Sequence, residues 1–416
     1  MALGRVLVDV QPLRESPAFR RLWVGSSLSI VGSMMTSFAV TLQVWTLTES
    51  VAAVGAVGLA AGLPAVVLGL VGGTIVDAFD RRTLVLITSS ALAVISAAFT
   101  LQAFAGLDQL WLLYLLVALQ SLLSSVDGPA RRTFTARLIP PQQFPAATAL
   151  MMLSMHSSVT VGPLLAGALS AGGGLKTCYL IDTITFAGAL YGVARLPPMR
   201  TDPDAGRPGL TAIVEGLRYI RTNRVVAGAL LADLSATVLG MPFALFPAIN
   251  SERFGGSSIS LGMLTAAVAV GGILASGLSG PVGRVSRQGA AMLIAGAVWG
   301  VGLLGFGLAG SLWLAVLMLM VAGGGDAISV IFRVSMIQSL TPDRYRGRTS
   351  AAEYVIGAAC PKLGDFRAGA VGSLASPTVS AISGGLTTIA GAALIAVALP
   401  ALARYQARTN QEQLTT

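Results

Sequence analysis

Charged residues are scarce in this sequence. Asp, Glu, Lys and Arg together make up 11% of its 416 residues, whereas about a quarter of a soluble domain is charged. Hydrophobic residues make up 54%, glycine occurs 49 times, and the mean hydropathy is +0.77. This balance excludes an ordinary soluble globular domain and indicates a membrane protein.

Cysteine and lysine are rare as well. Cys178 and Cys360 both lie in apolar runs, so we expect packed free thiols rather than a disulfide. Neither lysine, Lys176 or Lys362, follows a glycine, which excludes the phosphate-binding loop G-x-x-x-x-G-K-[ST]. We therefore expect no cofactor and no use of ATP, and take an ion gradient, by default the proton gradient, as the energy source.

The net charge of +9 does not indicate nucleic-acid binding, because neither a soluble basic domain nor a cluster of stacking aromatic residues accompanies it. Basic residues on a membrane protein usually set its topology and contact anionic lipids. The expected partners are a lipid bilayer and a small-molecule substrate, bound by a monomer. A membrane enzyme or signalling protein is the alternative from another class, and the sequence contains neither a catalytic cluster nor a soluble sensor domain.

Long apolar runs dominate the chain. A bilayer core about 30 Å thick needs about 20 helical residues, and the runs lack the period-two alternation of a barrel wall. The sequence therefore predicts an all-α membrane protein with twelve transmembrane helices. They are expected at 22–47, 51–76, 83–105, 110–130, 145–171, 176–195, 225–250, 257–281, 289–309, 312–335, 350–373 and 378–402.

Lysine and arginine are distributed unequally between the connecting segments. With a cytoplasmic N-terminus, the inner segments hold 23 of the 27, counting Arg333 at the end of its span, and the outer loops hold only Lys176 and Arg253. The positive-inside rule then places both termini in the cytoplasm. The N-terminal region has no cleavage site for a signal peptide, so we expect it to be retained in a multi-pass protein of the inner (cytoplasmic) membrane.

A polar interruption divides the chain into two groups of six spans. The expected domains are 1–195, a linker at 196–224, and 225–416. Apolar residues recur at helical spacing between Leu210 and Ile220, opposed by Glu215, Arg218 and Arg221, so the linker is expected to contain an amphipathic helix on the inner membrane surface. A plain connector is an equally good interpretation.

The two halves contain related sequences. Arg132 and the segment 139–144 are followed 201 positions later by Arg333 and the segment 340–345, and Gly162–Ala168 is followed 202 positions later by Gly364–Ala370. Parallel repeats around a central cavity are typical of secondary transporters that work by alternating access. The sequence predicts two pseudo-symmetric six-helix halves.

The turn from Gly73 to Arg82 carries a recognisable motif. Gly73, Asp77, Arg81 and Arg82 match positions 1, 5, 9 and 10 of G-x-x-x-D-[RK]-x-G-[RK]-[RK], with departures at Ala78 and Asp80. This pattern resembles the loop between helices 2 and 3 of the major facilitator superfamily. Two flanking segments, 19–23 and 127–131, resemble its enterobactin-exporter-like branch. This branch comprises the transmembrane secretion effectors and drug:proton antiporters.

The resemblance implies that this turn acts as a conformational latch. Asp77 is expected to face the positive N-terminus of the span at 350–373, which Thr349 or Ser350 would cap. The resemblance also brings an arginine from the end of the span at 110–130 into the latch, and either Arg131 or Arg132 matches. The simpler alternative is a solvated, positively charged turn.

The span at 145–171 carries a second motif. The stretch from Ser158 to Gly167 resembles the antiporter motif g-x-x-x-G-P-x-x-G-G, represented here by Gly162, Pro163 and Gly167. Small residues allow close helix packing, and proline kinks a helix. The resemblance implies export rather than uptake.

Proton coupling requires an ionisable group inside the bundle, where such groups are costly. Asp233 is the first candidate because no basic residue lies one turn away on its helix, and Asp182 is the second. For each, a carboxyl that hydrogen-bonds a neighbouring helix is the favoured alternative. Asp326 has no partner one turn away. Histidine as a residue type titrates near neutral pH, so His156 is a candidate proton relay, although a packed, hydrogen-bonded histidine is the favoured interpretation.

Other charges have structural explanations. Asp127 with Arg131 and Asp365 with Lys362 are expected to form ion pairs within their helices, and Arg367 to extend toward the membrane surface. The span at 350–373 is unusually charged, so we expect it to face water or the cavity. Its charged residues are Glu353, Lys362, Asp365 and Arg367.

Taken together, the sequence predicts a proton-linked exporter of a siderophore or related secondary metabolite. The alternative is a multidrug or antibiotic efflux pump of the same superfamily, and methionines such as Met155 would suit its adaptable binding surface.

Overall fold

The computed structural model describes residues 9–78, 80–196, 218–278 and 285–406, without the side chains of 69–78 and of several residues in 132–136 and 343–358. The N-terminal half comprises α1 (Gln11–Glu15), α2 (Pro17–Thr48), α3 (Val51–Ala78), α4 (Arg81–Ala105), α5 (Leu110–Leu138), η2 (Pro141–Gln143), α6 (Phe144–Gly173) and α7 (Leu175–Ala194). The C-terminal half comprises α9 (Arg224–Gly240), η3 (Phe243–Leu245), α10 (Phe246–Arg253), α11 (Ser258–Gly277), α12 (Gln288–Leu308), α13 (Leu312–Leu340), α14 (Asp343–Leu374), α15 (Pro377–Ala398) and α16 (Pro400–Ala403).

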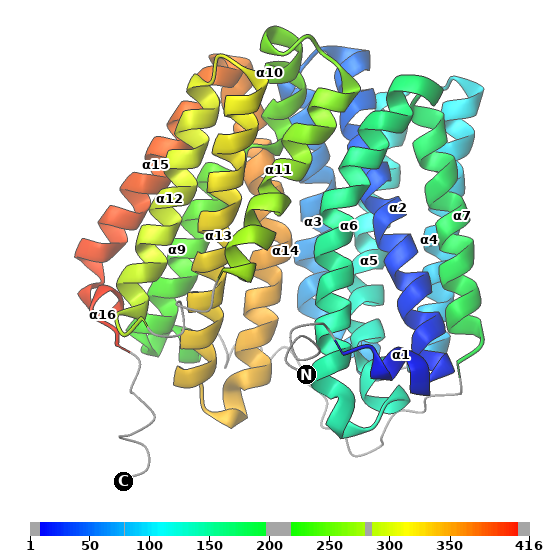
Figure 1. Cartoon of the computed structure of the whole chain (residues 1–416), viewed down its shortest axis with the longest axis horizontal. Coiled ribbons are helices and arrows are strands. Elements are labelled where there is room, and N and C mark those ends of the chain that lie inside the picture. The colour runs from blue at the N-terminus through cyan, green and yellow to red at the C-terminus, as the bar shows by residue number, and fades with distance from the viewer. Residues whose placement is uncertain (1–8, 79, 197–217, 279–284, 407–416) are drawn as a thin grey trace, which may run out of the picture.

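The two halves stand side by side as separate helical bundles (Figure 1). We call the side of the molecule on which α1 and α16 lie the terminal side, and the side on which α10 lies the distal side. Eleven of the described helical stretches are long and apolar enough to cross a membrane. The 32-residue α14 is also long enough but is too polar to meet that criterion. The all-α membrane fold is confirmed, and α14 completes the predicted set of spans.

Polar side chains mark where several long helices begin. The Ser16 hydroxyl accepts a hydrogen bond from the Phe19 N–H at the start of α2, and Asn223 caps α9 in the same way. Such caps satisfy N–H groups that have no partner within the helix. Cys178 and Cys360 are buried free thiols, as predicted.

The predicted span at 225–250 is wrong as a continuous helix. It breaks after Gly240, continues through η3 and resumes as α10. Pro242 lies at the break and Pro247 in the first turn of α10, and a proline cannot extend a helix that precedes it without losing a backbone hydrogen bond. The last span breaks similarly between α15 and α16, before Pro400.

Several helices extend beyond their predicted ends on the terminal side. α5 continues to Leu138, α13 to Leu340, and α14 begins at Asp343 rather than at residue 350. Hydropathy marks the bilayer and not the end of a helix, so charged helical turns outside it were missed. As a result Thr349 does not cap α14, because it lies inside the helix and donates its hydroxyl to the Tyr345 carbonyl.

The linker at 196–224 lies largely outside the described residues, including the apolar positions 210–217. The described part, 218–222, is helical, with Ile220 buried and Arg218 and Arg221 exposed. Tyr219 stacks on Tyr345 with ring centroids 4.8 Å apart and donates its hydroxyl to the Leu340 carbonyl at 2.6 Å. The end of the linker is therefore attached to the turn between α13 and α14.

Candidate functional site

A cavity of about 600 Å³ lies between the two halves. Its walls come from α2, α3 and α6 on one side and from η3, α11, α13 and α14 on the other. Most lining residues are apolar, including Phe38, Phe243, Phe246, Met34, Met155 and Met241. This size and composition are typical of small-molecule sites.

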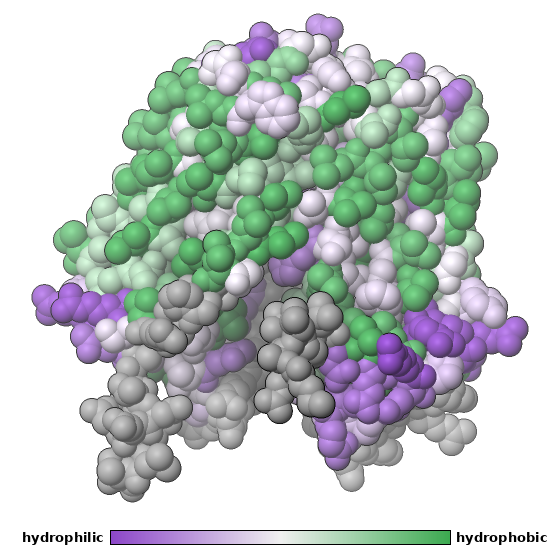
Figure 2. Space-filling view, in the orientation of Figure 1, coloured by the Kyte–Doolittle hydropathy of each residue, from purple (hydrophilic) through white to green (hydrophobic). Residues whose placement is uncertain are grey.

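Close backbone contacts join the halves on the distal side of the cavity. A Cβ atom added to Gly55 of α3 would lie 2.8 Å from the Cα of Gly369 in α14, and one added to Gly167 of α6 would lie 2.5 Å from the Ser258 carbonyl oxygen in α11. On the terminal side the surface is hollowed between the halves (Figure 2). The cavity is therefore sealed at its distal end and opens toward the terminal side.

Among the described residues, four with titratable side chains line the cavity: His156, Asp326, Lys362 and Asp365. Asp365 and Lys362 lie within electrostatic reach of each other but form no direct ion pair within 4.0 Å, and Asp365 accepts a hydrogen bond from the Ala244 N–H at 3.4 Å. The helix break at Pro242 supplies this free N–H group. The favoured interpretation of His156 is wrong, because its side chain is exposed and faces the cavity.

Asp233 and Arg333 form a buried ion pair between α9 and α13. This pair was not predicted, because its two members lie on different helices and the spacing of residues along one helix gives no signal of contacts between helices. Asp326 and Glu353 lie within electrostatic reach of both members. Three carboxylates thus surround one guanidinium. We call Asp233, Asp326, Arg333 and Glu353 the acidic cluster.

Members of the acidic cluster differ in their hydrogen bonding. Arg333 donates to Asp233 through one terminal nitrogen, whereas its Nε and Oε1 of Glu353 are buried without a hydrogen-bond partner. Among the described contacts, Asp326 has neither an ion pair nor a hydrogen bond. Since Asp326 also lines the cavity, it is the member that a ligand or water in the cavity reaches.

Asp182 is fully buried inside the N-terminal half and does not line the cavity. Its Oδ2 accepts hydrogen bonds at 2.8 Å from Thr36 of α2 and from Ser96 of α4. Its Oδ1 has no hydrogen-bond partner. These contacts fit the favoured alternative, a carboxyl group that holds neighbouring helices together.

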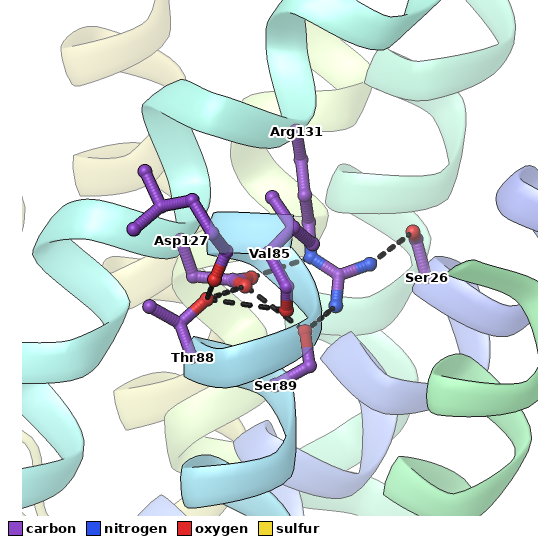
Figure 3. A network of polar contacts seen from close by, with 7 residues as sticks. Ser26, Val85, Thr88, Ser89, Asp127 and Arg131 are labelled. Carbon is purple, nitrogen blue, oxygen red and sulfur yellow. Dashed lines mark hydrogen bonds and ion pairs between the residues drawn. The ribbon is translucent and has the colours of Figure 1, made fainter. Parts of the chain in front are cut away.

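A second polar network joins α2, α4 and α5 (Figure 3). Arg131 pairs with Asp127 at 2.5 Å, as predicted, and also donates to Ser89 at 2.7 Å and Ser26 at 3.2 Å. Asp127 accepts further hydrogen bonds from Thr88 and Ser89. The hydroxyl partners were not predicted, because isolated serine and threonine residues in apolar runs give no signal of their contacts.

The predicted latch is only partly described. The side chains of Gly73, Asp77 and Arg132 lie outside the described residues. Asp80, at the usual glycine position of the motif, caps α4 by accepting from the Thr83 N–H at 2.9 Å. Arg82 donates to the Ala194 carbonyl at the end of α7, at 2.8 Å, where a cation also suits the helix dipole.

The antiporter motif packs α6 closely against two neighbours, as its small residues predict. A Cβ atom on Gly162 would lie 2.5 Å from Cβ of Met34 in α2, within the same half, whereas Gly167 contacts α11 in the other half. Pro163 lines the cavity. Residues of this one motif therefore pack within the N-terminal half, line the cavity and contact the C-terminal half. We call the contact of Gly167 with α11 the distal seam.

The charges of α14 are split between two environments. Lys362 and Asp365 face the cavity, as expected. Arg367 lies against Gly384 of α15, and its Nε is buried without a hydrogen-bond partner. Arg367 therefore does not show the expected extension to the membrane surface.

Comparisons with known proteins agree with this architecture. The model of the transmembrane secretion effector family matches residues 8–414. The enterobactin exporter EntS of Escherichia coli (strain SMS-3-5 / SECEC) is 27% identical over 416 residues, covering 98% of each chain. Among solved structures, the nucleoside transporter NupG has a TM-score of 0.70 at 15% identity, covering 93% of this chain and 99% of its own. The POT family transporter PepTSo has a TM-score of 0.74 at 12% identity, covering 93% and 98%.

Proposed function

We propose that this chain, which belongs to the transmembrane secretion effector family of the major facilitator superfamily, exports a siderophore or related secondary metabolite by alternating access. It is a multi-pass membrane transporter and not an enzyme. The observation that carries the proposal is the cavity between the halves, sealed on the distal side and open on the terminal side. The full-length similarity to enterobactin exporters supports a cargo of that class.

The orientation of the chain follows from its charges. With both termini in the cytoplasm, the terminal side of the protein faces the cytoplasm. The membrane that contains the protein is then the inner membrane. The cavity then opens toward the compartment from which an exporter loads. The seam at Gly167, within the antiporter motif, would separate when the cavity opens outward.

The energy source in this proposal is the proton gradient, with no cofactor and no second protein chain or nucleic acid. The acidic cluster has three carboxylates for one guanidinium, and an excess of buried negative charge favours proton uptake. Asp326 is the best-placed carrier because it lines the cavity and, among the described contacts, forms no hydrogen bond or direct ion pair. Asp233 would regulate it through Arg333, and His156 would relay protons along the cavity wall.

The latch remains part of this proposal. Asp77 would hold α3 against the terminal end of α14 when the cavity is closed on that side, with Arg81, Arg82 and Arg131 or Arg132 around it. Asp77→Asn is expected to abolish export while the protein stays in the membrane. Undiminished export by this variant would eliminate the latch.

A multidrug efflux pump is the second candidate. Met34, Met155 and Met241 line the cavity from both halves, and flexible methionine side chains adapt to ligands of different shape. This candidate predicts that several unrelated compounds, rather than one metabolite, depend on the protein for export.

The deciding experiment is deletion of the gene followed by mass spectrometry of cells and medium. We expect one secondary metabolite to accumulate in the cells and to decrease in the medium, and re-expression of the wild-type chain to reverse both changes. Retention of several unrelated drugs instead would favour multidrug efflux. If no compound changed its distribution, the proposal of export would be rejected.

A further inference from the structure

The segment between α9 and α10, residues 241–245, interrupts a helix within one membrane span, and we call it the break. A helix end leaves its last carbonyl groups, and the next helix its first N–H groups, without partners in the helix. Such groups are costly in a membrane unless other protein groups satisfy them. The break also forms part of the cavity wall, through Met241, Phe243 and Ala244.

One turn of α14 lies against the break. A Cβ atom added to Gly364 would lie 2.1 Å from the Thr237 carbonyl oxygen, in the last turn of α9, and 2.7 Å from Cβ of Met241. So close an approach requires a residue without a side chain. The backbone of α14 is therefore packed directly against the end of α9, and the charged residues of the same turn, Asp365 and Arg367, lie beside the break.

Asp365 faces the side of the break that has free N–H groups. It accepts a hydrogen bond from the Ala244 N–H at 3.4 Å, and the Phe243 N–H also interacts with it. Lys362, within electrostatic reach on the same helix, compensates its charge. A buried carboxylate is tolerated when N–H donors and a cation surround it in this way. Asp365 therefore holds the η3 side of the break in place.

Arg367 lies at the opposite side of the break, near the end of α9. Its Nη2 atom and the Leu239 carbonyl oxygen are each 3.0 Å from the position of a Cβ atom added to Gly384 of α15. The C-terminal end of a helix carries a partial negative charge, so a guanidinium group beside it is favourable without an acidic partner. This position explains why Arg367 stays within the bundle instead of extending to the membrane surface.

We propose that Asp365 and Arg367 are positioning residues for cargo binding. Their opposite charges hold the two sides of the break and thereby set where Met241 and Phe243 stand in the cavity wall. This inference rests on the proposed export function and identifies residues that shape its binding site. Because the two sides are held by different interactions, the two residues tolerate different replacements: Asp365 needs a hydrogen-bond acceptor, whereas Arg367 needs a positive charge.

A cysteine in the break tests the proposal without any cargo. Met241 is half-buried in the cavity wall, and Met241→Cys is combined with Cys178→Ser and Cys360→Ser, which remove the buried thiols. The purified full-length protein in nanodiscs is labelled with a water-soluble methanethiosulfonate reagent. Arg367→Gln should raise the labelling rate about two- to fivefold, as expected when one charge at a helix end is lost, because a break that is held less firmly exposes the thiol more often.

Conservative replacements separate positioning from simple packing. Arg367→Lys should keep the labelling rate close to that of the wild type, because it keeps the charge. Asp365→Leu should raise the rate, and Asp365→Asn should raise it less, because asparagine keeps an acceptor oxygen. In proteoliposomes loaded with the exported metabolite, Arg367→Gln should raise the half-saturating concentration by a similar factor and leave the maximal rate unchanged.

Two controls accompany the labelling. Arg287→Met removes an exposed arginine at the start of α12 and should leave the rate unchanged. Val159→Cys reports from the part of the cavity wall formed by α6, and its labelling should not respond to Arg367→Gln.

The proposal is rejected if Arg367→Gln leaves the labelling of Met241→Cys unchanged, if Arg367→Lys raises it equally, or if Val159→Cys is labelled faster as well. A half-saturating concentration that stays unchanged while labelling rises would reject the link to cargo binding. The labelling needs no cargo, so its result is independent of the metabolite measurement that tests export.

Discussion

Arg333 of α13 forms an ion pair with Asp233 of α9, and both side chains are buried within the C-terminal half. The two residues are separated by 100 positions in the chain. Removing one member of such a pair leaves an uncompensated charge in a low-dielectric interior, whereas removing both does not. The pair therefore links the stability of the C-terminal half to the residues proposed for coupling.

Asp233→Asn is expected to destabilise the protein by about 1–3 kcal/mol, because Arg333 loses its direct partner but Asp326 and Glu353 still compensate part of its charge. The loss should appear as a lower melting temperature of the purified protein in detergent and a lower yield from membranes. Arg333→Gln should destabilise the protein more than Asp233→Asn, because it leaves the three carboxylates of the acidic cluster without their cation. A single variant as stable as the wild type would show that the pair contributes little.

Asp326→Asn is expected to leave stability unchanged, since Asp326 has no described hydrogen bond or ion pair, and to uncouple transport from protons. In proteoliposomes loaded with the exported metabolite, exchange of labelled for unlabelled metabolite should persist without a pH gradient. Net transport driven by a pH gradient should be lost.

The matched control for this variant is Asp108→Asn, which changes an exposed aspartate in the turn between α4 and α5. It should behave like the wild type in both assays. If the Asp326→Asn variant still transports the metabolite in response to the pH gradient, Asp326 is not the proton carrier. Another member of the acidic cluster, or Asp182, would then have that role.

Hydropathy was sufficient to locate most of the spans, because the bilayer requires long apolar helices, but it did not predict the break after Gly240 or the helical turns outside the bilayer. Partners across helices were harder to predict. Asp127 and Arg131 lie one turn apart on one helix, so their pair could be read from spacing. Asp233 and Arg333 lie on different helices, and only the fold shows that they meet.

The internal repeat can be aligned with either of two spacings, 201 or 202 residues. A spacing of 201 relates Arg132 to Arg333, but the spacing of 202 seen at Gly162 and Gly364 relates Arg131 to Arg333. Arg131 and Arg333 each form an ion pair and each reach a neighbouring helix of their own half. The contacts thus favour the spacing of 202 and identify corresponding arginines in the two halves.

Arg131→Gln is expected to destabilise the N-terminal half by about 3 kcal/mol, because Asp127 then keeps only its hydroxyl donors Thr88 and Ser89. Arg131→Lys should lose less, since it keeps the charge but not the planar fork that reaches Ser26 and Ser89 together. Melting temperatures of the two variants measure this order. Equal losses would assign the effect to the hydrogen bonds of the guanidinium group and not to its charge.

Gly167→Ala is expected to open the distal seam between the halves. The new methyl group would lie 2.5 Å from the Ser258 carbonyl oxygen, a contact that backbone atoms relieve only by moving apart. Overpacking of this kind typically costs about 1–3 kcal/mol. If the cost applies only while the seam is closed, the ratio of the two access states shifts roughly 5- to 150-fold toward the state with the distal side open.

Spin labels at Glu49→Cys and Glu252→Cys report this opening, since both positions are exposed on the distal side of different halves. In Gly167→Ala, double electron–electron resonance should show a larger population at long distance. Gly162→Ala is the matched control, because its methyl group meets Met34 equally closely but within one half. It should lower stability without changing the distance distribution, and Gly172→Ala, with no atom within 4 Å of the added Cβ, should change neither. An unchanged distribution in Gly167→Ala would mean that the contact of α6 with α11 does not control access to the cavity.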